Sequence, residues 1–189
     1  MVVQRINTEY TKVEITNNHT CSQIKQLLID AKNNSSQWYK QFGSDVDSQL
    51  LPKTQLLVEL EQNIQQQGKI VQDLHSKIKQ KEQQLIDNTI ELVKVNCQAI
   101  IILGNTPSGS GSPLNPSVNT IVDKSLTQLT KTQSELNVLR EQHQQAQQIL
   151  NSNIDKLNRD KPKLLESIHK VFYKYFGYNK DSKQKQVIV

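Results

Sequence analysis

The sequence predicts an all-α protein, an elongated antiparallel coiled coil or helical hairpin with short flanking helices. Three observations lead to this fold class. Apolar residues make up 35% of the 189 residues, below the share of about 45–50% in globular domains. The chain instead holds 25 Gln and 16 Asn, so uncharged polar residues fill much of its surface. Two long stretches repeat apolar residues every seven positions, and a Gly- and Pro-rich segment separates them.

The first segment, residues 1–49, lacks this repeat and predicts one short amphipathic helix. Thr20 and Gln23 have the spacing of a capping box, in which each side chain bonds to the backbone N–H of the other residue. The apolar face that follows consists of Ile24, Leu27, Leu28 and Ala31. Gly43 is expected to end the helical stretch.

Three aromatic residues lie near the end of this segment: Trp38, Tyr39 and Phe42. They are candidate partner-binding residues, because aromatic side chains often carry much of the binding energy of an interface. The alternative is that they pack against the base of the long helices that follow.

Residues 50–103 predict the first coiled-coil helix. Its a positions are Leu57, Ile64, Val71, Ile78, Leu85, Leu92 and Ala99, and its d positions are Leu60, Gln67, Leu74, Lys81, Asn88, Val95 and Ile102. This run exceeds the three or four heptads, roughly, that indicate a coiled coil. The polar d residues Gln67, Lys81 and Asn88 reduce stability, and such positions usually specify register and partner. We therefore predict that these three residues contribute to partner binding.

Residues 104–118 predict a flexible loop rich in Gly, Pro and Ser. Gly104 and Gly109 have the spacing of a phosphate-binding loop, but Ser110 and Gly111 occupy the positions where that motif needs Lys and Ser or Thr. The segment is therefore interpreted as a hinge between two helices and not as a nucleotide site.

Residues 119–160 predict the second coiled-coil helix. The a positions of its heptad series run from Val122 to Val171 in steps of seven, and His143 is the polar residue among them. A polar residue at an a position more often specifies register than it binds a metal, so His143 is another candidate partner-binding residue. Pro162 is expected to end this helix near Arg159, because proline lacks a donor and clashes with the preceding turn. Asp160 would then cap a separate helix.

The two long helices are predicted to pair with each other as an antiparallel hairpin about the loop. A register that sets a positions against d positions puts Lys81 opposite His143 and Leu85 opposite Leu139. The alternative is that each helix pairs with a different chain and that the loop only spaces them.

Residues 161–189 predict a basic, aromatic C-terminal helix and tail. From Lys156 to Val189 nine Lys or Arg face three Asp or Glu, a net charge of +6. The candidate partner-binding residues here are Lys170, Phe172, Tyr173, Lys174, Tyr175 and Phe176. This pattern suits an acidic protein surface, a nucleic acid or an anionic membrane. The alternative is that the aromatic residues cap the base of the hairpin against Trp38, Tyr39 and Phe42.

The lack of a recognisable secretory signal and the cysteine pattern predict a cytoplasmic or nuclear protein. The N-terminus has no apolar segment of secretory length, and the longest apolar run is far shorter than the roughly 20 residues that span a bilayer. Cys21 and Cys97 lie far apart and form no CxxC pattern, which fits free thiols in a reducing compartment.

Residue patterns for catalysis are not found in the sequence. The four histidines have no metal-ligand spacing, and the carboxylates are scattered over helix surfaces. We therefore expect no enzyme activity, no cofactor and no metal. The sequence predicts a non-catalytic scaffold subunit that joins other coiled-coil proteins in a hetero-oligomeric assembly. Its general style resembles small coiled-coil subunits of kinetochore, tethering and cytoskeletal complexes. The alternative function is a binding module for nucleic acid or an acidic polymer.

Overall fold

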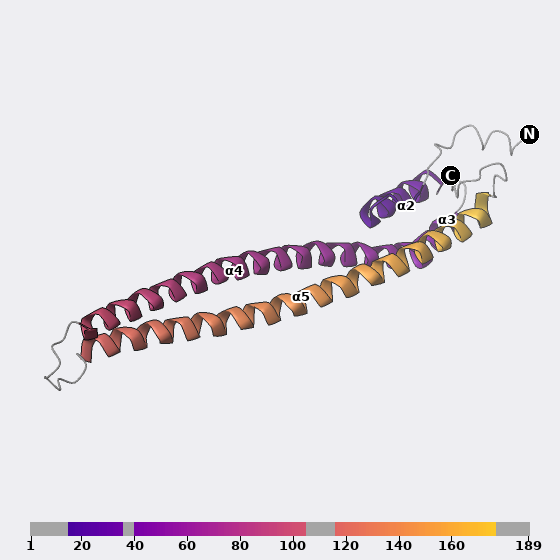
Figure 1. The fold of residues 1–189 in the computed structure, drawn as a ribbon. Helices are drawn as coiled ribbons and strands as arrows, with labels where there is room; N and C mark the ends of the chain where they lie inside the picture. Colours follow the sequence, from indigo (N-terminus) through magenta and orange to yellow (C-terminus); the bar gives the residue numbers. More distant parts are fainter. Residues whose placement is uncertain (1–14, 36–39, 105–115, 177–189) are drawn as a thin grey trace, which may run out of the picture. The chain divides into compact units, whose positions relative to one another are not determined.

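The computed structural model of the chain describes residues 15–35, 40–104 and 116–176, and every element within these ranges is a helix (Figure 1). This confirms the predicted all-α class for the described residues. Trp38, Tyr39, most of the predicted loop and the predicted C-terminal tail lie outside them.

The described elements are α2 (Cys21–Ser35), α3 (Lys40–Asp45), the π-helical segment η1 (Val46–Leu50), α4 (Leu51–Gly104) and α5 (Pro116–Phe176). The predicted capping box is confirmed at the start of α2. The Thr20 N–H donates to Gln23 Oε1 at 2.8 Å, and the Gln23 N–H donates to Thr20 Oγ1 at 3.2 Å. These two bonds satisfy donors that a helix start otherwise leaves without partners.

The first long helix begins earlier than its heptads suggested, because α3, η1 and α4 follow one another without a gap. Gly43 was expected to end a helix, but it is buried inside α3. The π-helical turn comes directly before Pro52, whose ring would clash with the carbonyl of Ser48 in a regular α-helix. In this turn the Leu51 N–H reaches back to the Val46 carbonyl. A widened turn of this kind lets the helix continue past a residue that cannot donate.

The helices α4 and α5 run antiparallel and lie side by side in each of the two compact units described below (Figure 1). Every predicted a and d position whose side chain is described is buried or half-buried, on both helices. The seven-residue repeat therefore predicted the covered face correctly along the described lengths of both helices.

The predicted break at Arg159 is wrong, because α5 continues through Pro162 as one helix of 61 residues. Pro162 costs the helix one backbone hydrogen bond, but its side chain is exposed and displaces nothing in the core. Leu164 and Ile168 on the following turns are buried, and Leu157 on the preceding turns packs against the same cluster. Packing on both sides of the proline stabilises a helix that local propensity would interrupt. Asp160 therefore lies inside a helix and caps nothing.

The chain divides into two compact units, each with parts of both long helices. The first unit holds the described residues up to 66 and from 150 onward, and it contains a contiguous apolar core. Residues from α2, α3, η1 and both long helices form this core, with Phe42, Phe172, Ile24 and Leu28 among its largest fully buried side chains.

The second unit, residues 67–149, consists of α4 and α5 alone among the described elements. Four of its described apolar side chains are buried: Ile78, Val95, Leu136 and Ala146. Two helices without further covering elements bury only a narrow seam, so polar contacts across that seam weigh more here than in the first unit.

Candidate partner-binding surfaces

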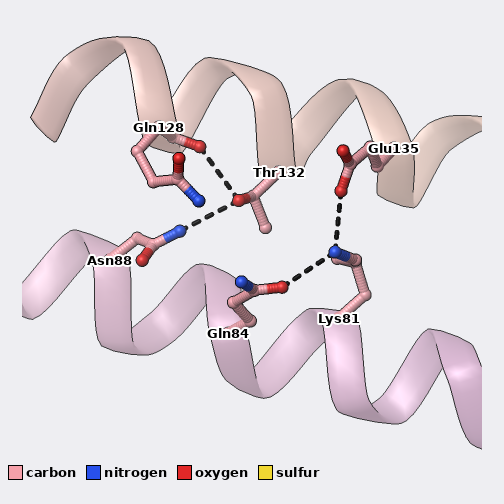
Figure 2. A network of polar contacts seen from close by, with 6 residues as sticks. All are labelled: Lys81, Gln84, Asn88, Gln128, Thr132 and Glu135. Carbon is pink, nitrogen blue, oxygen red and sulfur yellow. Dashed lines mark hydrogen bonds and ion pairs between the residues drawn. The ribbon is translucent and has the colours of Figure 1, made fainter. Parts of the chain in front are cut away.

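Lys81, predicted to bind a partner, forms an ion pair across the seam of the second unit (Figure 2). Its Nζ lies 2.7 Å from Glu135 Oε2 on α5 and donates to Gln84 Oε1 at 2.8 Å. The hydrogen bond from Lys81 lowers the pKa of the Glu135 carboxyl, and burial opposes this shift. A charge at a seam position is therefore matched from within the same chain.

Asn88 contacts the facing helix in the same way, two turns further along α4 (Figure 2). Its amide donates to Thr132 Oγ1 at 2.9 Å, and this hydroxyl donates in turn to the Gln128 carbonyl at 2.9 Å. Thr132 is 1% exposed, so a buried hydroxyl there requires partners of this kind. Within this chain, both Lys81 and Asn88 contact α5. Their role in binding a partner chain remains a prediction.

His143 faces His75, and their ring centroids lie 6.0 Å apart. The register that set Lys81 opposite His143 is therefore wrong, because Lys81 lies more than one turn beyond His75 along α4. Glu135 is the residue that Lys81 contacts. Repeats of seven residues leave the alternative registers nearly equivalent, and the sequence offers little to separate them.

Gln67, the third polar d residue, lies half-buried at the start of the second unit. A second ion pair joins α4 and α5 in this unit, between Arg140 Nη2 and Glu82 Oε1 at 2.8 Å. Both side chains are about half exposed, so we expect this pair to contribute less than about 1 kcal/mol.

Two of the C-terminal aromatic residues, Phe172 and Tyr175, pack against Phe42 within the first unit, in agreement with that part of the packing alternative. Phe42 of α3 is fully buried and packs edge-on against Phe172 and Tyr175, with ring centroids at 5.2 and 5.5 Å. Such edge-to-face pairs contribute about 0.5–1.5 kcal/mol beyond the area they bury. These contacts tie the end of α5 to α3.

Asp45, which the sequence analysis did not single out, is the polar centre of this contact. Its Oδ2 accepts from the Tyr175 hydroxyl at 2.6 Å and from Lys174 Nζ at 2.8 Å, and its Oδ1 accepts from Gln49 at 3.0 Å. The hydrogen bonds from Lys174 and then Tyr175 lower the pKa of Asp45, and the bond to Asp45 raises the pKa of Lys174. A short sequence motif cannot predict this cluster, because its members on α3 and α5 lie about 130 positions apart.

The other C-terminal candidates have different surroundings. Tyr173 is 56% exposed, and its ring stacks on His169 with centroids 6.4 Å apart. Lys170 is exposed and pairs with Glu166 one turn back at 2.8 Å. Phe176 ends α5, and its side chain lies outside the described residues.

A lysine-rimmed groove runs between α4 and α5 in the first unit, with a volume near 490 Å³. Its apolar lining consists of Leu56, Leu57, Leu60 and Leu164, and the lysines along it are Lys53, Lys156 and Lys163. Leu56 is 64% exposed and forms an apolar wall open to solvent. Lys163 contacts Asp160 at 3.2 Å. The hydrogen bond from Lys163 is the largest cause of a lowered pKa at this carboxyl.

An outer stripe of exposed apolar residues follows α4 in the second unit: Ile86, Ile90, Val93, Cys97 and Ile100. The four aliphatic residues are 48–68% exposed, and neighbouring Ile101 is 62% exposed. Their spacing of four, three, four and three residues puts them at b and f positions, on the helix face opposite the seam. The spacing of this stripe can be read from the sequence, but the sequence analysis did not identify it. The heptad was assigned from the a and d positions, which hold more apolar residues.

The two cysteines have opposite surroundings, and both are free thiols. Cys21 is fully buried at the start of α2, and its backbone N–H donates to Glu61 Oε2 at 2.8 Å. Burial, followed by the hydrogen bond and the charge of Glu61, raises the pKa of the Cys21 thiol to about 12. Cys97 is exposed within the outer stripe.

Among the described residues, no helix has the length and apolar character that crossing a membrane requires. Comparison of the chain with protein-family models, curated proteins and solved structures finds no match.

Proposed function

We propose that the protein is a non-catalytic scaffold subunit of a hetero-oligomeric intracellular assembly, of the kinetochore, tethering or cytoskeletal type. In this function α4 and α5 form an antiparallel coiled coil, and helices of other chains, either further copies of this chain or different subunits, dock on its outer faces. The single observation that best supports the proposal is the outer stripe of α4.

The outer stripe supports docking because the chain does not use it for its own hairpin. The a and d residues of α4 already face α5, so apolar residues at b and f positions have no role in that seam. Apolar residues scattered singly on a surface need no explanation, but a contiguous row does. A row at alternating spacings of three and four is the form in which one helix presents a face to another.

The lysine-rimmed groove is a second docking surface in this proposal. Exposed Leu56 supplies apolar area, and the three lysines outnumber the two carboxylates in the lining, Glu59 and Asp160, by one. An amphipathic helix with acidic flanks matches this combination. None of the C-terminal candidates from Lys170 to Phe176 lines this groove, so the groove is a docking surface in addition to the one predicted from the sequence.

The test is affinity purification of the tagged protein from its own cells at physiological salt, followed by quantitative mass spectrometry. The proposal expects a few other helical proteins at fixed ratios to the bait. Two variants each disrupt one surface: the pair Ile86→Lys with Ile90→Lys for the outer stripe, and Leu56→Lys for the groove. At least one of them should lose co-purifying subunits.

The pair Gln72→Lys with Ser76→Lys is the matched control for the stripe variant. It adds the same charge at the equivalent b and f positions two heptads earlier, where exposed polar residues stand. Recovery of the wild-type protein alone would contradict the proposal, and so would equal losses in the control.

The alternative function, a binding module for nucleic acid or an acidic polymer, would use the basic aromatic C-terminus. The contacts of Phe172, Lys174 and Tyr175 with α3 favour a packing role for these residues. The alternative expects binding that weakens steeply with added salt, because each neutralised phosphate releases counterions. An affinity for DNA, RNA or an acidic polymer that stays constant between low and physiological salt would exclude it.

A further inference from the structure

The outer stripe of α4 has the periodicity of a second coiled-coil seam. Written as its own heptad, Ile90 and Cys97 take one core position, and Ile86, Val93 and Ile100 take the other. The stripe extends over about 21 Å at 1.5 Å per residue. It faces away from α5, so a helix can lie along it without disturbing the hairpin seam.

The residues flanking the stripe are complementary to themselves when two copies lie antiparallel. Asp87 and Lys94 line one edge of the stripe, and Thr89 and Asn96 line the other. When Ile90 lies opposite Val93 of a second copy, Asp87 lies beside Lys94 of that copy. The two-fold axis of such a pair repeats the contact, so each dimer has two opposite-charge pairs on one edge.

Other arrangements of two copies lack this match. A shift by one heptad puts Lys94 beside Lys94 of the second copy, so two positive charges lie together. A parallel arrangement brings Asp87 next to Glu82, which are both acidic, and Glu82 is already paired with Arg140. Asp87 accepts a hydrogen bond from Gln83 on the same exposed surface, and Lys94 is exposed. Both charges are therefore accessible to a second copy.

We propose that the outer stripe binds the outer stripe of a second copy of this chain, antiparallel, with Asp87 of each copy beside Lys94 of the other. This rests on the outer stripe being a docking surface, as the proposed function holds, and adds the identity of the occupant. The lysine-rimmed groove then remains for other subunits of the assembly.

The test uses the purified full chain in analytical ultracentrifugation over a range of concentrations. The wild-type protein is expected to shift with concentration from its monomer mass of 21.6 kDa toward twice that mass. Asp87→Lys and Lys94→Asp each place like charges at both edge contacts and are expected to remain monomeric at concentrations where the wild type dimerises. An equal mixture of the two variants restores both opposite-charge pairs and is expected to recover the dimer.

A covalent readout checks the same register. In the variant Ile86→Cys, the introduced thiol would stand opposite native Cys97 of the second copy, so mild oxidation is expected to give a dimer band on a non-reducing gel. The control variant Ser76→Cys, on the same helix face but outside the stripe, is expected to give a far weaker dimer band. Within one chain, positions 86 and 97 lie about 16 Å apart along the helix and cannot bond.

Each result decides the proposal. A wild-type protein that stays monomeric overturns it, and the co-purification test of the proposed function remains independent of that outcome. A dimer that persists in both single variants, or a mixture that fails to associate although each variant is helical by circular dichroism, also overturns it. Recovery in the mixture, together with a cross-link between the thiol introduced by Ile86→Cys and Cys97 of the second copy, supports it.

Discussion

At the scale of single residues, Asp45 connects α3 to the C-terminal end of α5 within the first unit. One carboxylate accepts from a tyrosine hydroxyl, a lysine ammonium and a glutamine amide, with the first two contributed by α5. Hydrogen bonds to a charged acceptor are stronger than those between neutral groups. Phe42, three positions before Asp45 on α3, packs against Phe172 and against the ring of Tyr175, whose hydroxyl belongs to this cluster.

Asp45→Asn is predicted to lower the melting temperature at neutral pH, because the amide keeps the shape but loses the charge. The folded-state pKa of Asp45 lies below the ordinary value of 3.8. Its stabilising effect is therefore present above pH 3.8 and disappears as the pH falls through the lowered value. The difference in melting temperature between the two proteins should be constant near neutral pH and should shrink as the pH falls below 3.8 toward the lowered pKa.

The control is Asp73→Asn, which removes only an exposed ion pair with Lys77 on the surface of α4. Its melting temperature should stay close to that of the wild type throughout. A difference between Asp45→Asn and wild type that persists unchanged at the acidic end would mean that the carboxylate charge is not the cause.

Asn88 and Thr132 make the second residue-scale prediction. Asn88→Ala is expected to lower the free energy of unfolding by about 1 kcal/mol, because it removes one hydrogen bond from a buried hydroxyl. Thr132→Val added to this variant should cost much less than it costs alone. Urea denaturation of the four proteins of the cycle measures the coupling. Additive effects would show that the two side chains do not stabilise the seam together.

At the scale of elements, α5 continues through Pro162, which most helices would not do. The missing N–H leaves the Asn158 carbonyl without its intrahelical donor. Pro162→Ala should restore this bond and raise the free energy of unfolding by about 1–3 kcal/mol. Chemical denaturation followed by circular dichroism provides the measurement.

Gly68→Ala on α4 serves as a calibration for this prediction, since a Cβ there meets nothing within 4 Å. The free energy of unfolding of Gly68→Ala should rise by no more than about 1 kcal/mol, through helix propensity alone. A loss of stability in Pro162→Ala would indicate that the helix breaks at this position in solution.

At the scale of the whole molecule, the two units differ in how they are stabilised. Most of the buried apolar side chains described belong to the first unit, while the second relies on one narrow seam with polar layers. Local opening needs less free energy where fewer apolar contacts must be lost. The parts of a single helix that belong to different units should therefore exchange at different rates.

Hydrogen exchange measured by mass spectrometry is predicted to show this difference within α5. Backbone amides around Leu164 to Phe172 should exchange more slowly than those between residues 119 and 149. Equal protection along the whole of α5 would mean that the second unit opens only when the first unit does. In that case the narrow seam would not form a separate cooperative unit.

Much of the fold followed from patterns along the sequence. The capping box of Thr20 and Gln23 and the covered faces of both long helices depend on spacings of three, four and seven residues. Such spacings reflect local helix geometry, which each stretch of chain carries in itself. The stripe from Ile86 to Ile100 was legible in the same way, although it was not recognised.

Only the tertiary structure decided the features that depend on residues distant in sequence. The register that brings His75 to His143 and Lys81 to Glu135 was one of several that the repeat allows. The helix continues through Pro162 because buried residues on both sides outweigh a local penalty. Asp45 gained its role from partners about 130 positions away. The sequence alone determined the all-helical class and the covered faces of the two long helices, because these depend on local spacing. The tertiary structure decided helix boundaries, register and polar contacts, because these depend on packing between distant segments.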